Sequence, residues 1–184
     1  MEFLRRLFAG DPPGVDKSVV VVSGLPRSGT SMLMSMISAG GLEEVVDGVR
    51  QADDDNPRGY HELEAVKDLD KNGDTPWLDD AHGKVVKIIS FLLQHLPATH
   101  HYKIVFVRRS LQEVLASQQK MLDRRGASGG DAADAEMARV FAAHLSKVER
   151  QLAARKNCEA VSYTHLRAHE TDSYLGCRLL LEKK

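Results

Sequence analysis

The residues with the clearest chemical meaning lie in the stretch GLPRSGTS, residues 24–31, which has almost the outline of a phosphate-binding loop. Such a loop reads G-x-x-x-x-G-K-[ST], and Gly24 and Gly29 occupy its two glycine positions. Thr30 stands where the lysine belongs, and an arginine, Arg27, lies inside the loop instead. Backbone N–H groups in such a turn, with the amino end of a following helix, attract anions. The pattern therefore predicts a site for a tetrahedral anion, to which Arg27 adds a permanent positive charge.

The other polar groups of this loop favour one class of nucleotide over another. Ser28, Thr30 and Ser31 add hydroxyl donors beside the backbone N–H groups. Nucleoside triphosphatases place the loop lysine on the β- and γ-phosphates and hold magnesium with the loop Ser/Thr and an acidic partner. This chain lacks that lysine, and no clear apolar run ends in an aspartate that would hold the metal. We therefore expect a nucleotide with fewer phosphates, bound without a metal ion.

Apolar runs along the chain predict the elements that position the loop. The valine-rich run 18–23 comes directly before it and predicts a strand buried on both faces. Further strands are predicted over 84–90, over 101–107 and from residue 158 onward. Helical spacing predicts helices over 31–41, 61–71, 110–125 and 131–156. Strands that alternate with helices predict an α/β fold of the P-loop type, with three layers and a mainly parallel sheet.

Composition excludes several classes of function. With 184 residues, 42% hydrophobic and 28% charged, the chain has the length and balance of one globular domain. Its formal net charge of −1 gives no global field that would recruit nucleic acid or an acidic membrane surface. No run approaches the ~18 apolar residues of a membrane span. Cys158 and Cys177 offer neither a disulfide framework nor metal-ligand spacing, so we expect a cytoplasmic protein with reduced thiols.

The last 24 residues, 161–184, follow the predicted domain without a clear helical or strand period. Residues 161–171, VSYTHLRAHET, match the translation of one strand of a common transposase-based sequencing adapter, and residues 174–183 resemble its continuation. Segments foreign to a fold are set aside before its architecture is predicted. We therefore expect the natural chain to be cut near Ala160, which leaves the fold incomplete at the C-terminus. The predicted parts are an N-terminal extension (1–17), a P-loop domain (18–160) and an adapter-derived tail (161–184).

The stretch PRSGTS, residues 26–31, resembles a loop of a known enzyme family. It is similar to the 5′-phosphosulfate loop of sulfotransferases that use 3′-phosphoadenosine 5′-phosphosulfate (PAPS), whose commonest form is P-K-S-G-T-[ST]. Bacterial members often carry arginine in place of that lysine, as this chain does at Arg27. The resemblance implies PAPS as the sulfate donor, which would explain the missing triphosphate lysine. It also implies that the 5′-phosphosulfate is held by Arg27 and the rest of the loop, Ser28, Gly29, Thr30 and Ser31.

Two further stretches resemble the same family. In FVRRSLQEVLAS, Arg109 follows a predicted strand and Ser117 lies eight residues later on a predicted helix, as in the family's 3′-phosphate site. Arg108 is the alternative ligand if the register differs by one residue. The stretch DNPRGYHELE, residues 55–64, resembles the N-P-x-G-[YF]-x-E segment of bacterial members. With the loop, these stretches extend the resemblance over residues 18–160.

The resemblance implies transfer of a sulfuryl group from PAPS to a hydroxyl or amine on a small molecule, a glycan or a peptide. Arg27 would act on the bridging oxygen between the sulfate and the 5′-phosphate. Many members place a histidine base after a lysine in a K-T-H-L motif; here Lys87 fits the lysine, but the histidine position holds isoleucine. We therefore assign the base to Glu62, with His61 and Glu64 as alternatives from the same stretch.

Two rival functions stay open at the level of the sequence. A P-loop kinase for a small molecule would bind ATP with magnesium, which the missing lysine disfavours. A non-catalytic nucleotide-binding module would bind the nucleotide and transfer nothing. The family's far C-terminal segment, which helps to hold the 3′-phosphoadenosine, is absent here, so we expect weak binding or loss of activity in this chain.

Several other residues have less specific meaning. Tyr60 and Trp77 are candidates for an acceptor pocket or for the core. The neighbouring His100 and His101 have no metal-ligand company in the sequence, so we interpret both as surface residues and predict no metal site.

Overall fold

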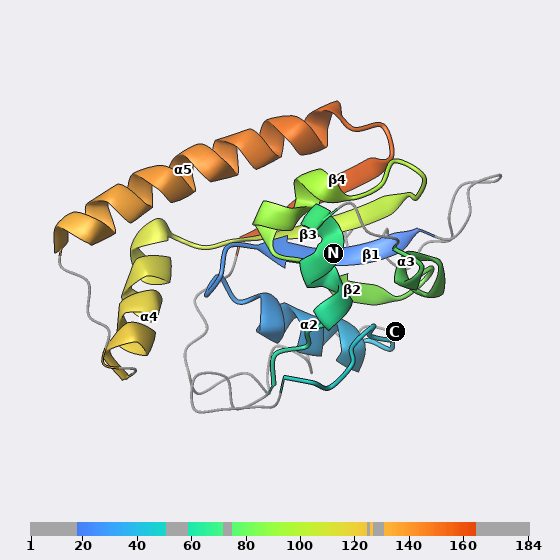
Figure 1. The fold of residues 1–184 in the computed structure, drawn as a ribbon, viewed down its shortest axis with the longest axis horizontal. Helices are drawn as coiled ribbons and strands as arrows, with labels where there is room; N and C mark the ends of the chain where they lie inside the picture. The colour runs from blue at the N-terminus through green and yellow to red at the C-terminus, as the bar shows by residue number, and fades with distance from the viewer. Residues whose placement is uncertain (1–17, 51–58, 72–74, 125, 127–130, 165–184) are drawn as a thin grey trace, which may run out of the picture.

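The computed structural model describes residues 18–50, 59–71, 75–124, 126 and 131–164. Within these residues the centre is a sheet of four strands, all parallel, in the order β2-β1-β3-β4 (Figure 1). The strands are β1 (Val19–Gly24), β2 (Val85–Lys87), β3 (Tyr102–Arg108) and β4 (Cys158–Thr164). Helical segments lie on both faces of this sheet, so the predicted α/β fold with three layers and a parallel sheet is confirmed.

The described residues contain six helical segments. They are α2 (Thr30–Ala39), η1 (Glu64–Lys71), α3 (Trp77–Asp80), η2 (Ser90–His95), α4 (Leu111–Arg124) and α5 (Asp131–Ala154). Figure 1 shows α2 on one side of the sheet and the long helix α5 on the other. In this part of the chain no helix combines the length and the apolar content that crossing a membrane requires.

Strand β1 is central to the core because the side chains on both of its faces are buried. Val19 and Val21 face a cluster that includes residues of η1, α3, η2 and α5. Val20 and Val22 face the opposite cluster, to which α2 contributes Leu33. Each of the four valines is at most 3% exposed, and burying one such side chain contributes roughly 1.5–3 kcal/mol. The predicted doubly buried strand is confirmed, and it fixes the position of the loop that follows it.

Strands β1 and β3 each lie one residue later than predicted, and the ends of β2 and β4 differ more. Strand β2 ends at Lys87, earlier than predicted, because the chain then turns into η2, whose Leu93 joins the core. Strand β4 continues to Thr164, past the predicted end of the domain, and pairs with β3 along its whole length. Its side chains are mostly exposed, so the pairing rests mainly on backbone hydrogen bonds. The β-branched and aromatic residues of β4 favour the extended conformation that makes these bonds. The predicted extension 1–17 and residues 165–184 of the predicted tail lie outside the described residues.

The helix predictions hold where the apolar period is long. Helices α4 and α5 lie within the predicted ranges; α2 begins one residue before its predicted range and ends directly before Gly40. The segment predicted over 61–71 forms the 3-10 helix η1 instead of an α-helix. Helices α3 and η2 were not predicted, because segments of four and six residues are too short to display a helical period.

Gly24, the first glycine of the loop, ends β1 at a point where no side chain fits. A Cβ atom there would lie 2.6 Å from Ser28 Oγ and 2.8 Å from the carbonyl oxygen of Val107 in β3. The β3 backbone cannot easily yield, because it is paired with a strand on each side. The close approach of the two strand ends therefore requires glycine at this position.

We expect Gly24→Ala to destabilise the fold by about 1–3 kcal/mol, the usual cost of overpacking a close contact. Urea denaturation followed by circular dichroism measures the change in the free energy of unfolding. The double variant Gly24→Ala/Ser28→Ala removes only the contact with the hydroxyl, so part of the loss should persist. An unchanged denaturation midpoint in the single variant would contradict the close approach.

Candidate functional site

The order of the strands places a crevice at the ends of β1 and β3. The chain leaves β1 for β2 on one side, and after β2 it crosses back to β3 on the other side. Ligands of parallel α/β sheets bind at the carboxyl ends of the strands where the connections diverge in this way. The loop 25–29 follows β1, and Arg109 follows β3, so both lie at this point. The two predicted anion sites therefore share one edge of the sheet.

The loop has the backbone conformation of an anion cradle. Gly29 precedes α2 in the left-handed region with φ 102°, and Arg27 has φ 66°. Alternation of left- and right-handed residues turns successive N–H groups toward one side. No side chain caps the amino end of α2, and its first turn holds no acidic residue. The helix end therefore presents its N–H groups and the positive end of its dipole to a ligand.

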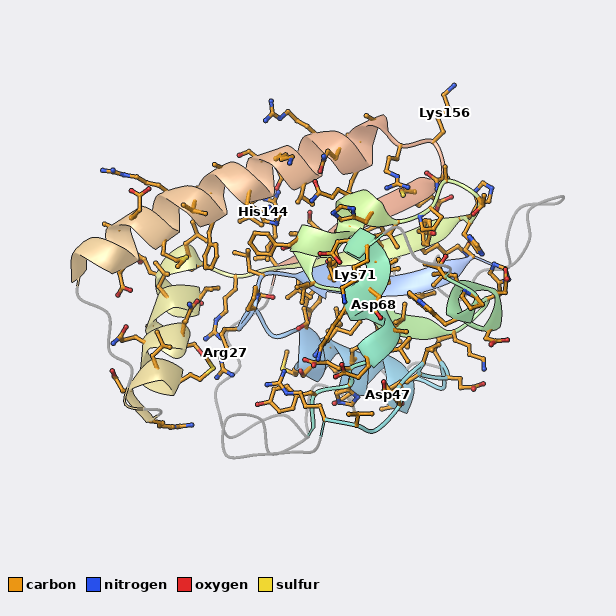
Figure 2. All side chains as sticks on the ribbon, viewed as in Figure 1. Arg27, Asp47, Asp68, Lys71, His144 and Lys156 are labelled. Carbon is orange, nitrogen blue, oxygen red and sulfur yellow. The ribbon has the colours of Figure 1, made fainter. Side chains whose placement is uncertain are left out.

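Three residues that were predicted to bind phosphate groups lie in one cluster. Arg27 Nε donates to Ser117 Oγ on α4 at 3.1 Å, which places the arginine between the loop and α4 (Figure 2). Arg109 Nη1 donates to the carbonyl oxygen of Arg27 at 3.2 Å, and its Nε lies 3.3 Å from a carboxylate oxygen of Glu113. The structure thus brings together residues that are about 80 to 90 positions apart in the sequence.

A pocket of about 490 Å³ opens beside this cluster, between the loop, the end of β3, α4 and α5. Ser28 and Arg109 both line it. The Ser28 hydroxyl oxygen is buried and has no hydrogen-bond partner among the described residues. A buried polar atom without a partner is costly, so a ligand oxygen near it would be favourable. Arg108, the alternative ligand, also lines the pocket, but its guanidinium group pairs with Glu149 of α5.

Lys87 and Glu62, both predicted to be catalytic, form an ion pair at the end of β2. Lys87 Nζ lies 3.2 Å from Glu62 Oε1 and also donates to the carbonyl oxygen of Tyr60. Arg50 lies 3.1 Å from both oxygens of the same carboxylate. Burial lowers the pKa of Lys87, and the nearby Glu62 carboxylate opposes that shift. The ion pair is therefore partly buried, and hydrogen bonds hold the Lys87 ammonium group in place.

The candidate base His61 belongs to a different chain of hydrogen bonds. His61 Nδ1 lies 2.7 Å from Glu44 Oε2, and His61 Nε2 lies 3.0 Å from Ser35 Oγ of α2. A carboxylate on one ring nitrogen orients the imidazole and supports a proton-accepting role for the other. Glu64, the third candidate, pairs with Lys67 on the exposed surface of η1.

Several site partners were missed by sequence reasoning. Arg50 and Glu44 come from a segment without a recognisable period, so no local signal marked them. Ser35 lies one helical turn after Ser31 on α2 and donates to the carbonyl oxygen of that residue. The spacing of four residues indicated that both serines lie on the same face of the helix. Asn56, Pro57 and Arg58 of the third family-like stretch lie outside the described residues.

The structure changes the interpretation of the aromatic residues and of one histidine. The Tyr60 ring is buried and packs under Arg50, whose guanidinium carbon lies 3.4 Å from the ring centroid. Trp77 packs against the main core cluster. The prediction that His100 is a surface residue without metal-ligand company is wrong, because its side chain is 13% exposed and approaches Asp79. Its neighbour His101 is exposed, as predicted.

Comparison with known proteins gives no functional assignment. No protein-family model and no curated protein matches the chain. A solved structure described as the crystal structure of APE1195 is similar at 14% sequence identity, with 90% of this chain and 94% of that chain covered and a TM-score of 0.37. A likeness this distant carries no argument about function. The similarity of the loop to sulfotransferases therefore stays a prediction.

The buried Lys87 should make the free energy of unfolding depend on pH. Its pKa in the folded protein lies below the value of about 10.4 for an unfolded lysine. Between these two values the unfolded chain binds more protons, so the free energy of unfolding rises with pH. Lys87→Met keeps the apolar stem and removes the charge, so we expect its slope to be smaller than that of the wild type.

Urea denaturation at about pH 8.5 and about pH 10.5, the range just below the unfolded pKa, measures this difference in slope. The matched control is Lys156→Met, because Lys156 is exposed and extends away from the protein (Figure 2). We expect the control to follow the wild type at both pH values. Equal slopes for wild type and Lys87→Met would show that Lys87 is not a desolvated cation.

Proposed function

We propose that the protein is a sulfotransferase that moves a sulfuryl group from PAPS to a hydroxyl or amine acceptor. The observation that carries this proposal is the convergence of Arg27, Arg109 and Ser117 beside the loop at the ends of β1 and β3. A nucleotide with phosphate groups at both its 3′ and 5′ positions matches two adjacent clusters of donors. We further propose a cytoplasmic location and an acceptor that is a small molecule, a glycan or a peptide, with no role for nucleic acid.

The residues at the loop suit the 5′-phosphosulfate end of this donor. Backbone N–H groups at the start of α2, the hydroxyls of Thr30 and Ser31, and the unpartnered Ser28 hydroxyl supply donors for one tetrahedral group. Arg109 and Ser117 suit the 3′-phosphate, because a forked guanidinium group and a hydroxyl bind phosphate oxygens well. Arg27 lies between the two sets and supports a role at the bridging oxygen.

In the proposed reaction the acceptor oxygen or nitrogen attacks the sulfur atom in line. A new bond from the acceptor to sulfur forms, and the bond from sulfur to the bridging oxygen breaks with its electron pair left on the 5′-phosphate. Negative charge grows on that oxygen, where a preorganised guanidinium group is most effective. The acceptor proton passes to a base, which we assign to Glu62; Lys87 and Arg50 hold its carboxylate in place. His61, backed by Glu44, is the alternative base to be tested.

We expect the chain to bind adenosine 3′,5′-bisphosphate in preference to ATP with magnesium, as isothermal titration calorimetry can measure. Removing one charged donor should cost about 1.5–3 kcal/mol, so Arg27→Ala and Arg109→Ala should each weaken binding about 10- to 100-fold. Arg139→Ala is the matched control, because Arg139 lies on α5 and is 82% exposed. Preference for ATP with magnesium would favour a kinase and contradict the proposal.

A transfer screen with radiolabelled donor separates the enzyme from a non-catalytic binding module. We expect Arg27→Ala to lower the transfer rate by about 100-fold or more, since loss of one transition-state donor costs about 3 kcal/mol. Glu62→Gln should lower the rate at unchanged nucleotide affinity. If instead only His61→Ala does so, the base is His61. Nucleotide binding without transfer to any hydroxyl or amine acceptor would contradict catalysis by this chain.

A further inference from the structure

We propose that Asp79, His82 and His100 form a binding site for one divalent transition-metal ion, with zinc as the best match. Each residue offers one ligand atom, and these three atoms lie within 4.8 Å of one another. Asp79 and His82 come directly before β2, and His100 comes directly before β3. Because the strands are parallel, this cluster lies at the amino edge of the sheet, opposite the candidate nucleotide site. The proposal is therefore independent of the proposed transfer reaction.

The spacing of the ligand atoms suits a tetrahedral ion. Zinc binds imidazole nitrogen and carboxylate oxygen at about 2.0–2.2 Å, so two ligands of a tetrahedral site lie roughly 3.4 Å apart. His100 Nε2 and Asp79 Oδ1 are 3.1 Å apart, and the rings of His82 and His100 have centroids 5.2 Å apart with a tilt of 37°. Small rotations of the side chains bring three atoms around one ion. Two imidazoles with one carboxylate leave a fourth position for water.

The backbone on the α3 side is held in place by the core. Leu78 and Ala81, which flank Asp79 and precede His82, are fully buried. The turn after α3 is closed by Lys84 N, which donates to the carbonyl oxygen of Ala81 at 3.0 Å. Two of the three ligands therefore sit in a short segment that the fold positions before any ion binds.

The backbone and the ring of His100 are both oriented by hydrogen bonds. Asn157 Nδ2 donates to the carbonyl oxygen of His100 at 2.8 Å, which fixes the chain just before β3. Thr99 Oγ1 lies 2.9 Å from His100 Nδ1. This contact directs the other ring nitrogen, Nε2, toward Asp79. Metal-binding histidines commonly use their second nitrogen in this way.

Burial and exposure at the cluster also suit an ion that enters from solvent. The His100 side chain is 13% exposed, whereas the Asp79 side chain is 75% exposed. The ion would meet two partly shielded imidazoles and one carboxylate that closes over it from the surface. Imidazole ligands favour zinc, copper and nickel over magnesium and calcium. An ion here would join the segment before β2 to the segment before β3 and stabilise the folded state.

Calorimetric titration of the full chain with zinc chloride tests the proposal, and we expect one ion per chain. His100→Ala and Asp79→Asn should each weaken binding at least about 10-fold. Asp79→Asn guards against misfolding, because this exposed side chain changes by one atom only. His101→Ala is the matched control: it removes an exposed imidazole next to the site and should leave the affinity unchanged. A chain with His165→Ala and His169→Ala should also still bind one ion.

A second measurement reports on the place of binding. Trp77 is the single tryptophan and lies two residues before Asp79 on α3, so bound Co²⁺ should quench its fluorescence in the wild type and much less in His100→Ala. At a zinc concentration about a hundredfold above Kd, the thermal midpoint should rise by about 5–10 °C. Unchanged affinity in both Asp79→Asn and His100→Ala, or no binding at all, would overturn the site and leave only a hydrogen bond between these two residues.

Discussion

The candidate nucleotide site depends on how closely the ends of β1 and β3 approach each other. At Gly24 the two strands are nearer than a side chain allows, because a Cβ atom there would lie only 2.8 Å from the carbonyl oxygen of Val107. Two residues beyond Val107, Arg109 donates to the carbonyl oxygen of Arg27. The loop is therefore attached to the neighbouring strand through its backbone as well as through the core beneath it. The backbone N–H donors of a loop held in this way need no reorganisation when an anion arrives, which is the condition for strong electrostatic stabilisation.

Lysine and arginine side chains are held by two different kinds of partner along the same edge of the sheet. At the end of β2 the buried Lys87 is matched by the Glu62 carboxylate, which Arg50 shares. At the ends of β1 and β3, Arg27 donates to the Ser117 hydroxyl, whereas Arg109 donates to the carbonyl oxygen of Arg27 and pairs with the Glu113 carboxylate. The first arrangement positions a carboxylate; the second orients two guanidinium groups beside the loop.

Local sequence patterns predicted those elements whose structure is determined by residues close together in the sequence. The valine run of β1, the two loop glycines and the apolar periods of α2, α4 and α5 each carry their signal within one segment. Contacts between loops carry no such signal. The pairing of His100 with Asp79 joins segments about 20 residues apart, and neither sequence pattern nor propensity brings them together. The sequence therefore predicted the loop after β1 and the position of Arg109 beside it. It did not predict the cluster at the opposite edge, whose side chains meet only once parallel strands align their amino ends.

The contact between Arg27 and Ser117 has a consequence for how a nucleotide would bind. Arg27 Nε donates to a neutral hydroxyl at 3.1 Å, and a hydrogen bond of this kind contributes about 1 kcal/mol net, against about 1.5–3 kcal/mol for a bond that involves charged groups. A phosphosulfate group at the loop would therefore attract the guanidinium group away from the hydroxyl. Ser117 only accepts the hydrogen bond from Arg27, so its own O–H group could donate to a 3′-phosphate whether or not Arg27 moves. One hydroxyl could therefore contact Arg27 and a 3′-phosphate together, so the contact between Arg27 and Ser117 would hold the two proposed phosphate positions next to each other.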